Sequence, residues 1–202
     1  MKLTVHTFLT LDGVMQAPGA PDEDSEGGFD LGGWQPPLFD EETGRIIDGW
    51  FDGAEAFLLG RRTYDIFASY WPTSSAPEGL IASKLNELPK YVASRSTPHL
   101  EWHNSHLLAS DTVAAVRELK ERPGGDLHVW GSSELVQMLL GADLVDELRL
   151  LSYPLVLGKG RRLFAEGLNA SSWKLVEHTA TRSGAVLGVY RFNGRPVFGS
   201  FS

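Results

Sequence analysis

A repeated change from strand-like to helix-like periodicity across one glycine restricts the fold more than any other feature of the chain. Apolar residues run up to Gly60 in FLLG and up to Gly131 in LHVWG, and helical spacing follows each glycine. Strand and helix patterns alternate in this way from residue 54 to residue 158. Such alternation indicates an α/β fold, in which helices cover both faces of a mostly parallel sheet.

Hydrophobic periodicity and turn residues set the limits of each expected element. Strands are predicted over residues 2–13, 54–60, 90–96, 106–109, 126–131 and 144–158. Helices are predicted over residues 38–53, 61–71, 110–125 and 132–143, with Asp40 and Asp111 as capping residues. Two β-rich segments, 173–184 and 185–194, are expected to form an antiparallel hairpin that turns at Ser183 and Gly184. We expect a single domain over residues 1–202.

Composition argues against several kinds of partner and site. The net charge of −8 disfavours nucleic acid as a partner, because its phosphates would be repelled. The absence of cysteine excludes disulfides and thiolate metal sites and favours a cytoplasmic location. No run reaches about 18 apolar residues and the N-terminus is unlike a signal peptide, so we expect no membrane partner. His103 and His106 have no third ligand nearby in sequence, so no metal site is predicted.

Residues 15–37 form a long loop rich in glycine, proline and acidic residues. A loop of this length in a compact domain is usually a functional lid or a disordered segment. Phe29 and Trp34 argue against plain disorder, because solvated linkers seldom carry large aromatic side chains. This composition predicts few local contacts, so we expect the loop to be mobile in the free protein and to become ordered over a cofactor.

The two strand–glycine–helix corners are candidate phosphate sites. Backbone N–H groups at a helix N-terminus lack partners and the helix dipole is positive there, so anions bind readily. Arg61 and Arg62 would add charge and a forked donor geometry, which suits the 2′-phosphate of NADPH. The alternative is that each corner only turns the chain and that both arginines are solvated surface residues. His6 and His128 fall within expected strands, where they would pack or hydrogen-bond.

Five segments occur in order along nearly the whole chain, namely LTLDGVM, LLGRRTYDIFASYWP, YVASRS, LHVWGSSELVQMLL and LVDELRLLSYPLVLGKGRRLF. Together they resemble the dihydrofolate-reductase-like family, which includes the C-terminal reductase domain of bacterial riboflavin biosynthesis. The resemblance implies a three-layer α/β/α domain whose mostly parallel central sheet binds NADPH across the carboxyl ends of its strands. Open α/β sheets generally bind their ligands at that edge.

The resemblance also implies which residues meet NADPH. One segment covers the nicotinamide, a second meets the 2′-phosphate and pyrophosphate, a third lies beside the adenosine ribose, and a fourth faces the pyrophosphate. In that order they comprise Asp12, Gly13, Val14 and Met15; Gly60, Arg61, Arg62 and Thr63; Ser94 and Arg95; and Gly131, Ser132, Ser133, Glu134 and Leu135. Trp130-Gly131 stands where many relatives carry paired glycines, and Lys159 in the Gly158–Gly160 turn is expected to be solvated.

The implied reaction is hydride transfer from NADPH to a C=N or C=O group of a small heterocycle, of the pterin, folate or riboflavin-precursor pyrimidine type. Asp40 is the candidate catalytic carboxylate, with Asp30 and Glu41 as competitors, although a helix cap is the role we expect first for Asp40. The alternative function is a non-catalytic nucleotide-binding protein that keeps the reductase fold as a sensor or dimeric scaffold. A homodimer is compatible with either function.

Overall fold

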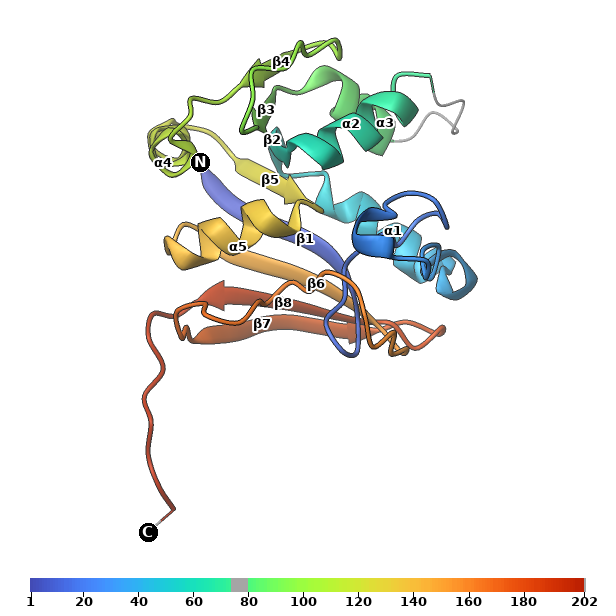
Figure 1. Ribbon diagram of the computed structural model, residues 1–202. Helices are drawn as coiled ribbons and strands as arrows, with labels where there is room; N and C mark the ends of the chain where they lie inside the picture. The colour runs from blue at the N-terminus through green and yellow to red at the C-terminus, as the bar shows by residue number, and fades with distance from the viewer. Residues whose placement is uncertain (74–79, 202) are drawn as a thin grey trace.

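The computed structural model describes residues 1–73 and 80–201, and within them eight strands form one sheet (Figure 1). The spatial order is β4-β3-β2-β5-β1-β6-β8-β7. All neighbours from β4 to β6 pair in parallel, whereas β8 pairs antiparallel with both β6 and β7. The strands are β1 (Lys2–Thr10), β2 (Ala54–Gly60), β3 (Lys90–Ala93), β4 (Ser105–Leu107), β5 (Asp126–Trp130), β6 (Glu147–Tyr153), β7 (Trp173–Ala180) and β8 (Val186–Phe192). The predicted α/β class with an antiparallel C-terminal hairpin is confirmed.

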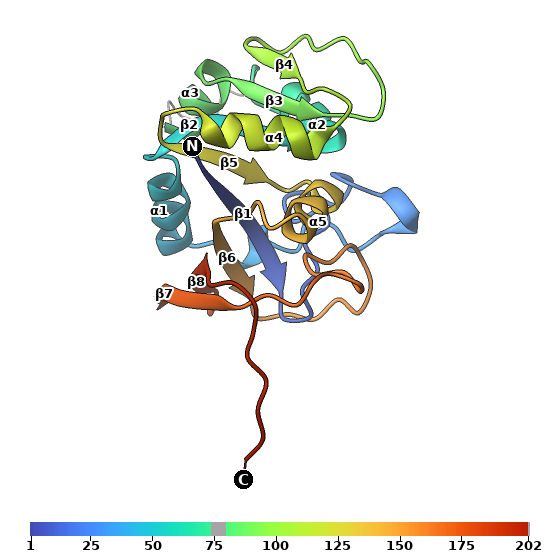
Figure 2. The ribbon, with the colours of Figure 1, turned by 90° about the vertical axis from the view of Figure 1, so that its left-hand side faces the viewer.

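Helices cover both faces of the sheet, so the molecule has three layers. One face packs against α1 (Glu41–Trp50), α2 (Arg61–Tyr70) and α3 (Leu80–Glu87), and the other packs against α4 (Thr112–Glu121) and α5 (Ser133–Gly141). Figure 2 shows α1 on one side of β1 and β6 and α5 on the other. Among the helices described, none is long and apolar enough to cross a membrane.

The first strand shows how the sequence builds two cores. Successive side chains of a strand point to opposite faces. Leu3 and Val5 of β1 therefore enter the core beneath α4 and α5, whereas His6 and Phe8 belong to the aromatic-rich side beneath α1. Both faces of the central strands are buried, as expected for a parallel sheet between two helical layers.

The structure corrects several predicted boundaries. Strand β3 ends at Ala93 rather than at residue 96, β4 covers Ser105–Leu107 rather than residues 106–109, and β6 ends at Tyr153. The last correction has a clear cause, since Pro154 lacks the N–H that a central strand must donate. Helix α3 was not predicted at all, although its apolar residues Ile81 and Leu85 have helical spacing and Pro89 lies two residues beyond its end.

The loop over residues 15–37 makes many local contacts, so the prediction of few contacts is wrong. Its aromatic residues Phe29 and Trp34 are buried. The indole Nε1 of Trp34 donates to the Gln16 carbonyl at 2.9 Å, and Gln35 Nε2 donates to the Tyr153 hydroxyl at 2.9 Å. Two short 3-10 turns, Glu26–Gly28 and Pro36–Leu38, interrupt the loop. Its mobility in the free protein remains a prediction.

Candidate cofactor-binding site

All four segments expected to meet the cofactor lie at the carboxyl ends of adjacent parallel strands. Ser94 and Arg95 follow β3, the segment 60–63 spans the end of β2 and the start of α2, the segment 131–135 follows β5, and the segment 12–15 follows β1. These strands are neighbours in the order β3-β2-β5-β1. The fold therefore brings together residues that are up to about 120 positions apart in the chain along one edge of the sheet.

Ser132 joins the two strand–glycine–helix corners. Its hydroxyl accepts from the Gly60 N–H at 2.9 Å and donates to the Trp130 carbonyl at 2.8 Å. Its own N–H donates to Thr63 Oγ1 at 3.0 Å. Gly131 and Ser132 both have left-handed backbone conformations, with φ of 53° and 56°. A Cβ at Gly131 would lie 3.1 Å from Thr63 Oγ1, so glycine keeps the two corners close together.

The helices that begin at these corners, α2 and α5, differ from α1 and α4 in their N-terminal caps. Asp40 accepts from the Thr43 N–H at 2.8 Å and caps α1, and Asp111 accepts from the Ala114 N–H at 3.0 Å and caps α4, as predicted. Helices α2 and α5 have no capping hydrogen bond from any side chain of the described residues. Their first N–H groups are therefore available for an anion, so the donor set fits the phosphate groups of a nucleotide.

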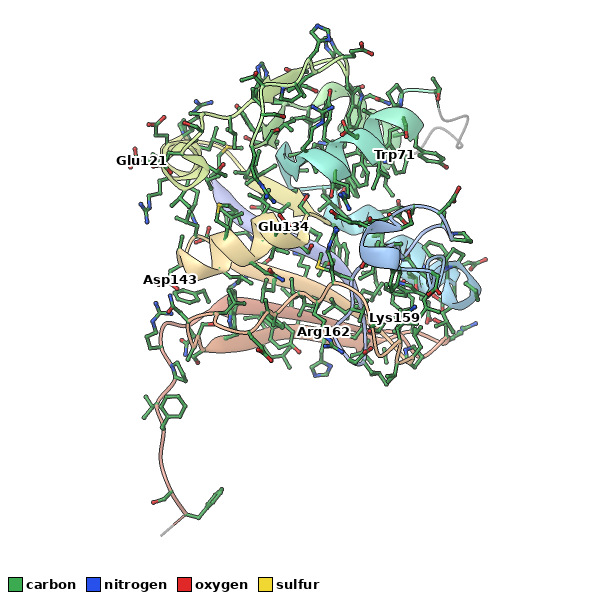
Figure 3. All side chains as sticks on the ribbon, viewed as in Figure 1. Trp71, Glu121, Glu134, Asp143, Lys159 and Arg162 are labelled. Carbon is green, nitrogen blue, oxygen red and sulfur yellow. The ribbon has the colours of Figure 1, made fainter. Side chains whose placement is uncertain are left out.

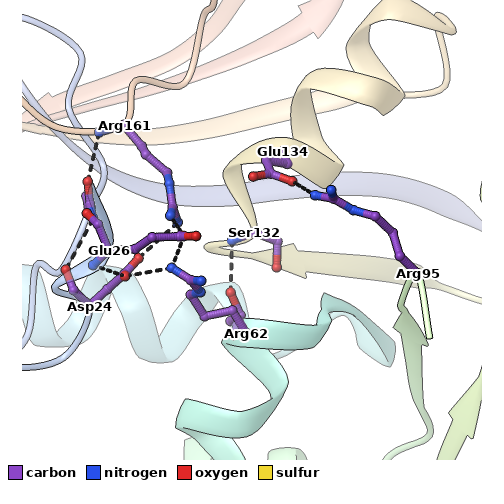
Figure 4. Close-up of polar contacts among 9 residues, drawn as sticks. Asp24, Glu26, Arg62, Arg95, Ser132, Glu134 and Arg161 are labelled. Atoms are coloured by element: carbon purple, nitrogen blue, oxygen red, sulfur yellow. Dashed lines mark hydrogen bonds and ion pairs between the residues drawn. The ribbon is translucent and has the colours of Figure 1, made fainter. Parts of the chain in front are cut away.

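The two predicted arginines point to different partners. Arg61 Nε pairs with Asp65 Oδ2 on the same helix at 2.7 Å. Arg62 Nη1 reaches the long loop, where it lies 3.0 Å from Asp24 Oδ1 and also contacts Glu26 (Figure 4). Arg95, which follows β3 on the side of the site toward β4, pairs with Glu134 on α5. The sequence predicted the positions of these cations but not their carboxylate partners.

Arg161 shares its ion-pair partners with Arg62, although it was not among the predicted residues. Its guanidinium contacts the same two carboxylates as Arg62, with Nη1 3.1 Å from Asp24 Oδ2 and Nη2 against Glu26 (Figure 4). The sequence feature that could have indicated Arg161 is the pair of arginines in GKGRRLF, because a pair of arginines also occurs in LLGRRTY. Lys159 in this turn is exposed to solvent, as expected, and its Nζ pairs with the exposed Asp30 at 2.6 Å. Figure 3 shows Lys159 in the same region of the molecule as Arg162.

The loop after β1 is anchored by Asp12. The Asp12 carboxylate accepts from Thr10 Oγ1 at 2.6 Å and from the Gly158 N–H at 2.9 Å. These hydrogen bonds, that of Thr10 first, hold the pKa of Asp12 well below its usual value. Val14 and Met15 are buried, as is Leu135 on α5, so these three side chains support the site from the core.

Asp40 has the contacts of a structural carboxylate. Besides capping α1, it accepts from the Ser183 N–H at 2.9 Å through its second oxygen. Backbone hydrogen bonds, that of Thr43 first, lower the pKa of Asp40 well below its usual value. Asp40 therefore joins α1 to the β7–β8 turn and is ionised at neutral pH, which disfavours a role as proton donor.

A pair of histidines lies in the core beneath this edge. His6 and His128 are fully buried on β1 and β5, with ring centroids 4.1 Å apart. His6 stacks on Trp130 at 4.9 Å. Neither ring has a hydrogen-bond partner within the described residues, so of the two expected roles packing is the one observed. Burial lowers the pKa of His128 to about 3 and holds that of His6 well below its usual value.

A groove of about 860 Å³ lies beside the site rather than within it. It follows α2 from Arg61 to Pro72 and is closed on its other side by Asn86, Trp102 and His103. Arg61 is shared between this groove and the predicted phosphate site.

Comparison with known proteins agrees with this geometry. Residues 1–187 match the family of the RibD C-terminal domain. The chain is 32% identical over 143 residues to the uncharacterized protein YyaP of Bacillus subtilis, an overlap that covers 69% of this chain and 75% of YyaP.

Solved structures share the fold at low sequence identity. A protein assigned to riboflavin biosynthesis from Shewanella sp. PV-4 superposes with a TM-score of 0.71 at 20% identity, covering 96% of this chain and 99% of that one. The dihydrofolate reductase of Enterococcus faecalis, complexed with NADP(H), gives a TM-score of 0.60 at 12% identity, covering 95% and 96%. The deaminase/5-amino-6-(5-phosphoribosylamino)uracil reductase of Thermotoga maritima gives 0.63 at 15% identity, covering 95% of this chain and 56% of that one. The chain has a reductase fold of the dihydrofolate-reductase-like type and belongs to the RibD C-terminal domain family.

Proposed function

We propose that this protein is an NADPH-dependent reductase that transfers hydride to a small heterocyclic substrate of the pterin, folate or riboflavin-precursor pyrimidine type. One observation carries the proposal: the segments 94–95, 60–63, 131–135 and 12–15 lie side by side at the carboxyl ends of β3, β2, β5 and β1. Family membership and the reductase fold support the same reaction class.

The residues of this chain would bind and orient the cofactor, which supplies the hydride when bound. The free N–H groups at the start of α2 and α5 would hold phosphate groups, and Ser132 fixes the spacing between the two helices. Arg61 would meet the 2′-phosphate, because it follows β2, which is the neighbour of β3. The family resemblance implies that Ser94 and Arg95, which follow β3, lie beside the adenosine ribose. The loop over residues 15–37 would exclude water from the reacting groups.

NADPH preference is the first testable consequence. A charge-assisted hydrogen bond contributes about 1.5–3 kcal/mol, so Arg61→Ala should weaken NADPH binding by roughly tenfold to a hundredfold. NADH binding should be nearly unchanged, because NADH has no 2′-phosphate. Calorimetric dissociation constants for both cofactors measure this, with the exposed helix variant Arg45→Ala as a control. Parallel changes in both affinities would show that Arg61 does not select the cofactor.

Substrate reduction is tested by following the absorbance of NADPH, which falls as NADPH is oxidised. Dihydrofolate, the deaminated pyrimidine precursor of riboflavin, and a panel of small imines and ketones should be offered separately to the purified protein. Oxidation of NADPH with one heterocycle and not with the simple imines and ketones would support the proposal. Tight NADPH binding without turnover on any of them would contradict it.

Such a result would favour the second candidate, a nucleotide-binding protein without catalysis. A specific observation supports this alternative: the carboxylates of Asp12 and Asp40 are both occupied by backbone N–H groups. Neither is free to protonate a substrate, so a reductase would need a proton from water or from another residue.

A further inference from the structure

Two arginines from distant parts of the chain meet at the same pair of carboxylates. Arg62 is the second residue of α2, and Arg161 lies in the turn after β6, about 100 residues later. Asp24 lies between them, 3.0 Å from Arg62 Nη1 and 3.1 Å from Arg161 Nη1. Glu26 contacts both guanidinium groups as well. Two positive charges therefore face each other across a space filled by two negative charges (Figure 4).

The carboxylates are brought to this place by the long loop. Gln16 Nε2 donates to the backbone carbonyls of Asp24 at 3.2 Å and of Glu26 at 3.1 Å. Gln16 Oε1 accepts from the Arg161 N–H at 3.0 Å. The amide of Gln16 thus holds the acidic segment against the turn that carries Arg161, and the two carboxylates then reach the guanidinium groups.

The position of the cluster connects it to the phosphate site. Arg62 is the neighbour of Thr63, whose hydroxyl binds the Ser132 N–H at the start of α5. In Figure 4 Arg62 lies between Ser132 on one side and the two acidic side chains on the other. An anion bound at the free N–H groups of α5 would therefore approach Arg62 closely and compete with the carboxylates for its guanidinium.

We propose that Arg62 and Arg161 form a two-arginine clamp for the pyrophosphate of the cofactor, and that Asp24 and Glu26 occupy this clamp when the cofactor is absent. This inference rests on the proposed function, because it assigns the ligand of the same site. The charges match, since a dinucleotide pyrophosphate carries two negative charges and would replace two carboxylates. Arginine forks suit phosphate oxygens as well as they suit carboxylates.

The exchange requires that the resident ion pairs be weak enough to break. The side chains of Arg62 and Glu26 are 45% and 47% exposed, so water screens their ion pair and it contributes little. Arg161 and Asp24 are 27% and 12% exposed, so their ion pair is the harder one to break. A pyrophosphate would gain the clamp and the N–H groups at the start of α5 together, whereas within the described residues the only other hydrogen bond of the two carboxylates is the one that Asp24 Oδ1 accepts from the Glu26 N–H at 3.1 Å within the same segment. The loop segment over residues 24–26 would move away from the clamp as the cofactor binds.

The chain offers a matched control in Arg162. This arginine follows Arg161 directly, and its guanidinium binds the carbonyl and carboxylate of Asp12 instead of Asp24 and Glu26. Both side chains are partly exposed, at 27% for Arg161 and 48% for Arg162. Arg161→Met and Arg162→Met remove the same charge from neighbouring positions, so a difference between them reports on the clamp and not on net charge.

The test uses calorimetry to measure the binding of inorganic pyrophosphate, NADPH and NADH to five proteins: wild type, Arg161→Met, Arg161→Lys, Arg162→Met and the double variant Asp24→Asn/Glu26→Gln. We expect Arg161→Met to weaken all three ligands by about tenfold or more, and Arg162→Met to change them by less than about threefold. The double variant should bind all three several-fold more tightly, because the competing charges are gone. Thermal unfolding of each variant shows that the protein remains folded, and Arg161→Lys should recover only part of the affinity because it lacks the fork.

The outcomes separate the clamp from the proposed function. Equal affinities for Arg161→Met and Arg162→Met would overturn the clamp while leaving a wild type that binds NADPH consistent with a reductase. Unchanged or weaker binding by the double variant would overturn the exchange with Asp24 and Glu26. The wild type could instead bind pyrophosphate, with the affinity lost in Arg161→Met, but bind neither NADPH nor NADH. That result would support the clamp and contradict the proposed function.

Discussion

At the scale of single residues, the acidic side chains near the sheet edge act mainly as anchors. Asp12 joins the loop after β1 to the turn at Gly158, and Asp40 joins α1 to the β7–β8 turn. The sequence showed that these carboxylates lie near the site, but their second hydrogen bonds come from residues more than 140 positions away. No local pattern indicates such a partner, so the sequence alone left the choice between anchor and catalytic acid open.

Asp40→Asn tests this choice directly. Asparagine caps helices about as well as aspartate, so the variant should keep kcat within about twofold if Asp40 only caps α1. A catalytic acid or base replaced in this way would instead lower kcat by about 10²–10⁴-fold. The melting temperature should fall slightly, because the amide NH₂ group cannot accept from the Ser183 N–H. Asp111→Asn, which changes the cap of α4 away from this edge, serves as the control.

At the scale of elements, the sequence predicts best where local signals agree. Strand β2 spans the predicted residues, and capping aspartates precede α1 and α4 as expected. Strand ends were overestimated where apolar residues continue beyond the last paired residue, as at Leu155 and Leu157 after β6. The clamp arginine Arg161 could not be assigned, because its partners belong to a loop whose folding depends on contacts with Gln16 and Trp34.

Helix α3, which was not predicted, depends on a buried lysine. Lys90 is fully buried, and its Nζ donates to the carbonyls of Leu85 at 2.8 Å and Leu88 at 2.9 Å at the end of α3. Burial lowers the pKa of Lys90 to about 8. We expect Lys90→Met to lower the free energy of unfolding by roughly 1–3 kcal/mol, because the carbonyls lose a donor that water cannot replace. Urea unfolding measures this, and an equal loss in the partly exposed Lys84→Met would contradict the capping role.

At the scale of the whole molecule, the stacking of two helical layers on one sheet places His6 and His128 where water does not reach them. The two strands that carry them become neighbours only through the crossover that brings β5 beside β1. Their sequence context, alternating strands with one histidine each, gave no sign that the rings would meet. Neither ring has a hydrogen bond within the described residues that would stabilise its charged form in the core. The pair therefore lowers the free energy of unfolding at every pH at which the histidines are charged in the unfolded chain.

This burial gives the stability of the molecule a defined pH dependence. The pKa values of both histidines are lower in the folded protein than the value of about 6.5 expected in the unfolded chain, so the unfolded chain takes up the protons first. Their effect is absent above pH 7 and grows as the pH falls below about 6.5, at up to about 1.4 kcal/mol per pH unit for each histidine. Between pH 7 and pH 5 the pair should lower the free energy of unfolding by roughly 3–4 kcal/mol.

The double variant His6→Leu/His128→Leu should lose this part of the pH dependence. At pH 7 it should be about as stable as the wild type, since apolar side chains of similar size leave no unpaired nitrogen. Urea unfolding at both pH values, with the exposed His103→Gln as control, measures the difference, and an equal drop in wild type and double variant would assign the acid sensitivity to the carboxylates instead.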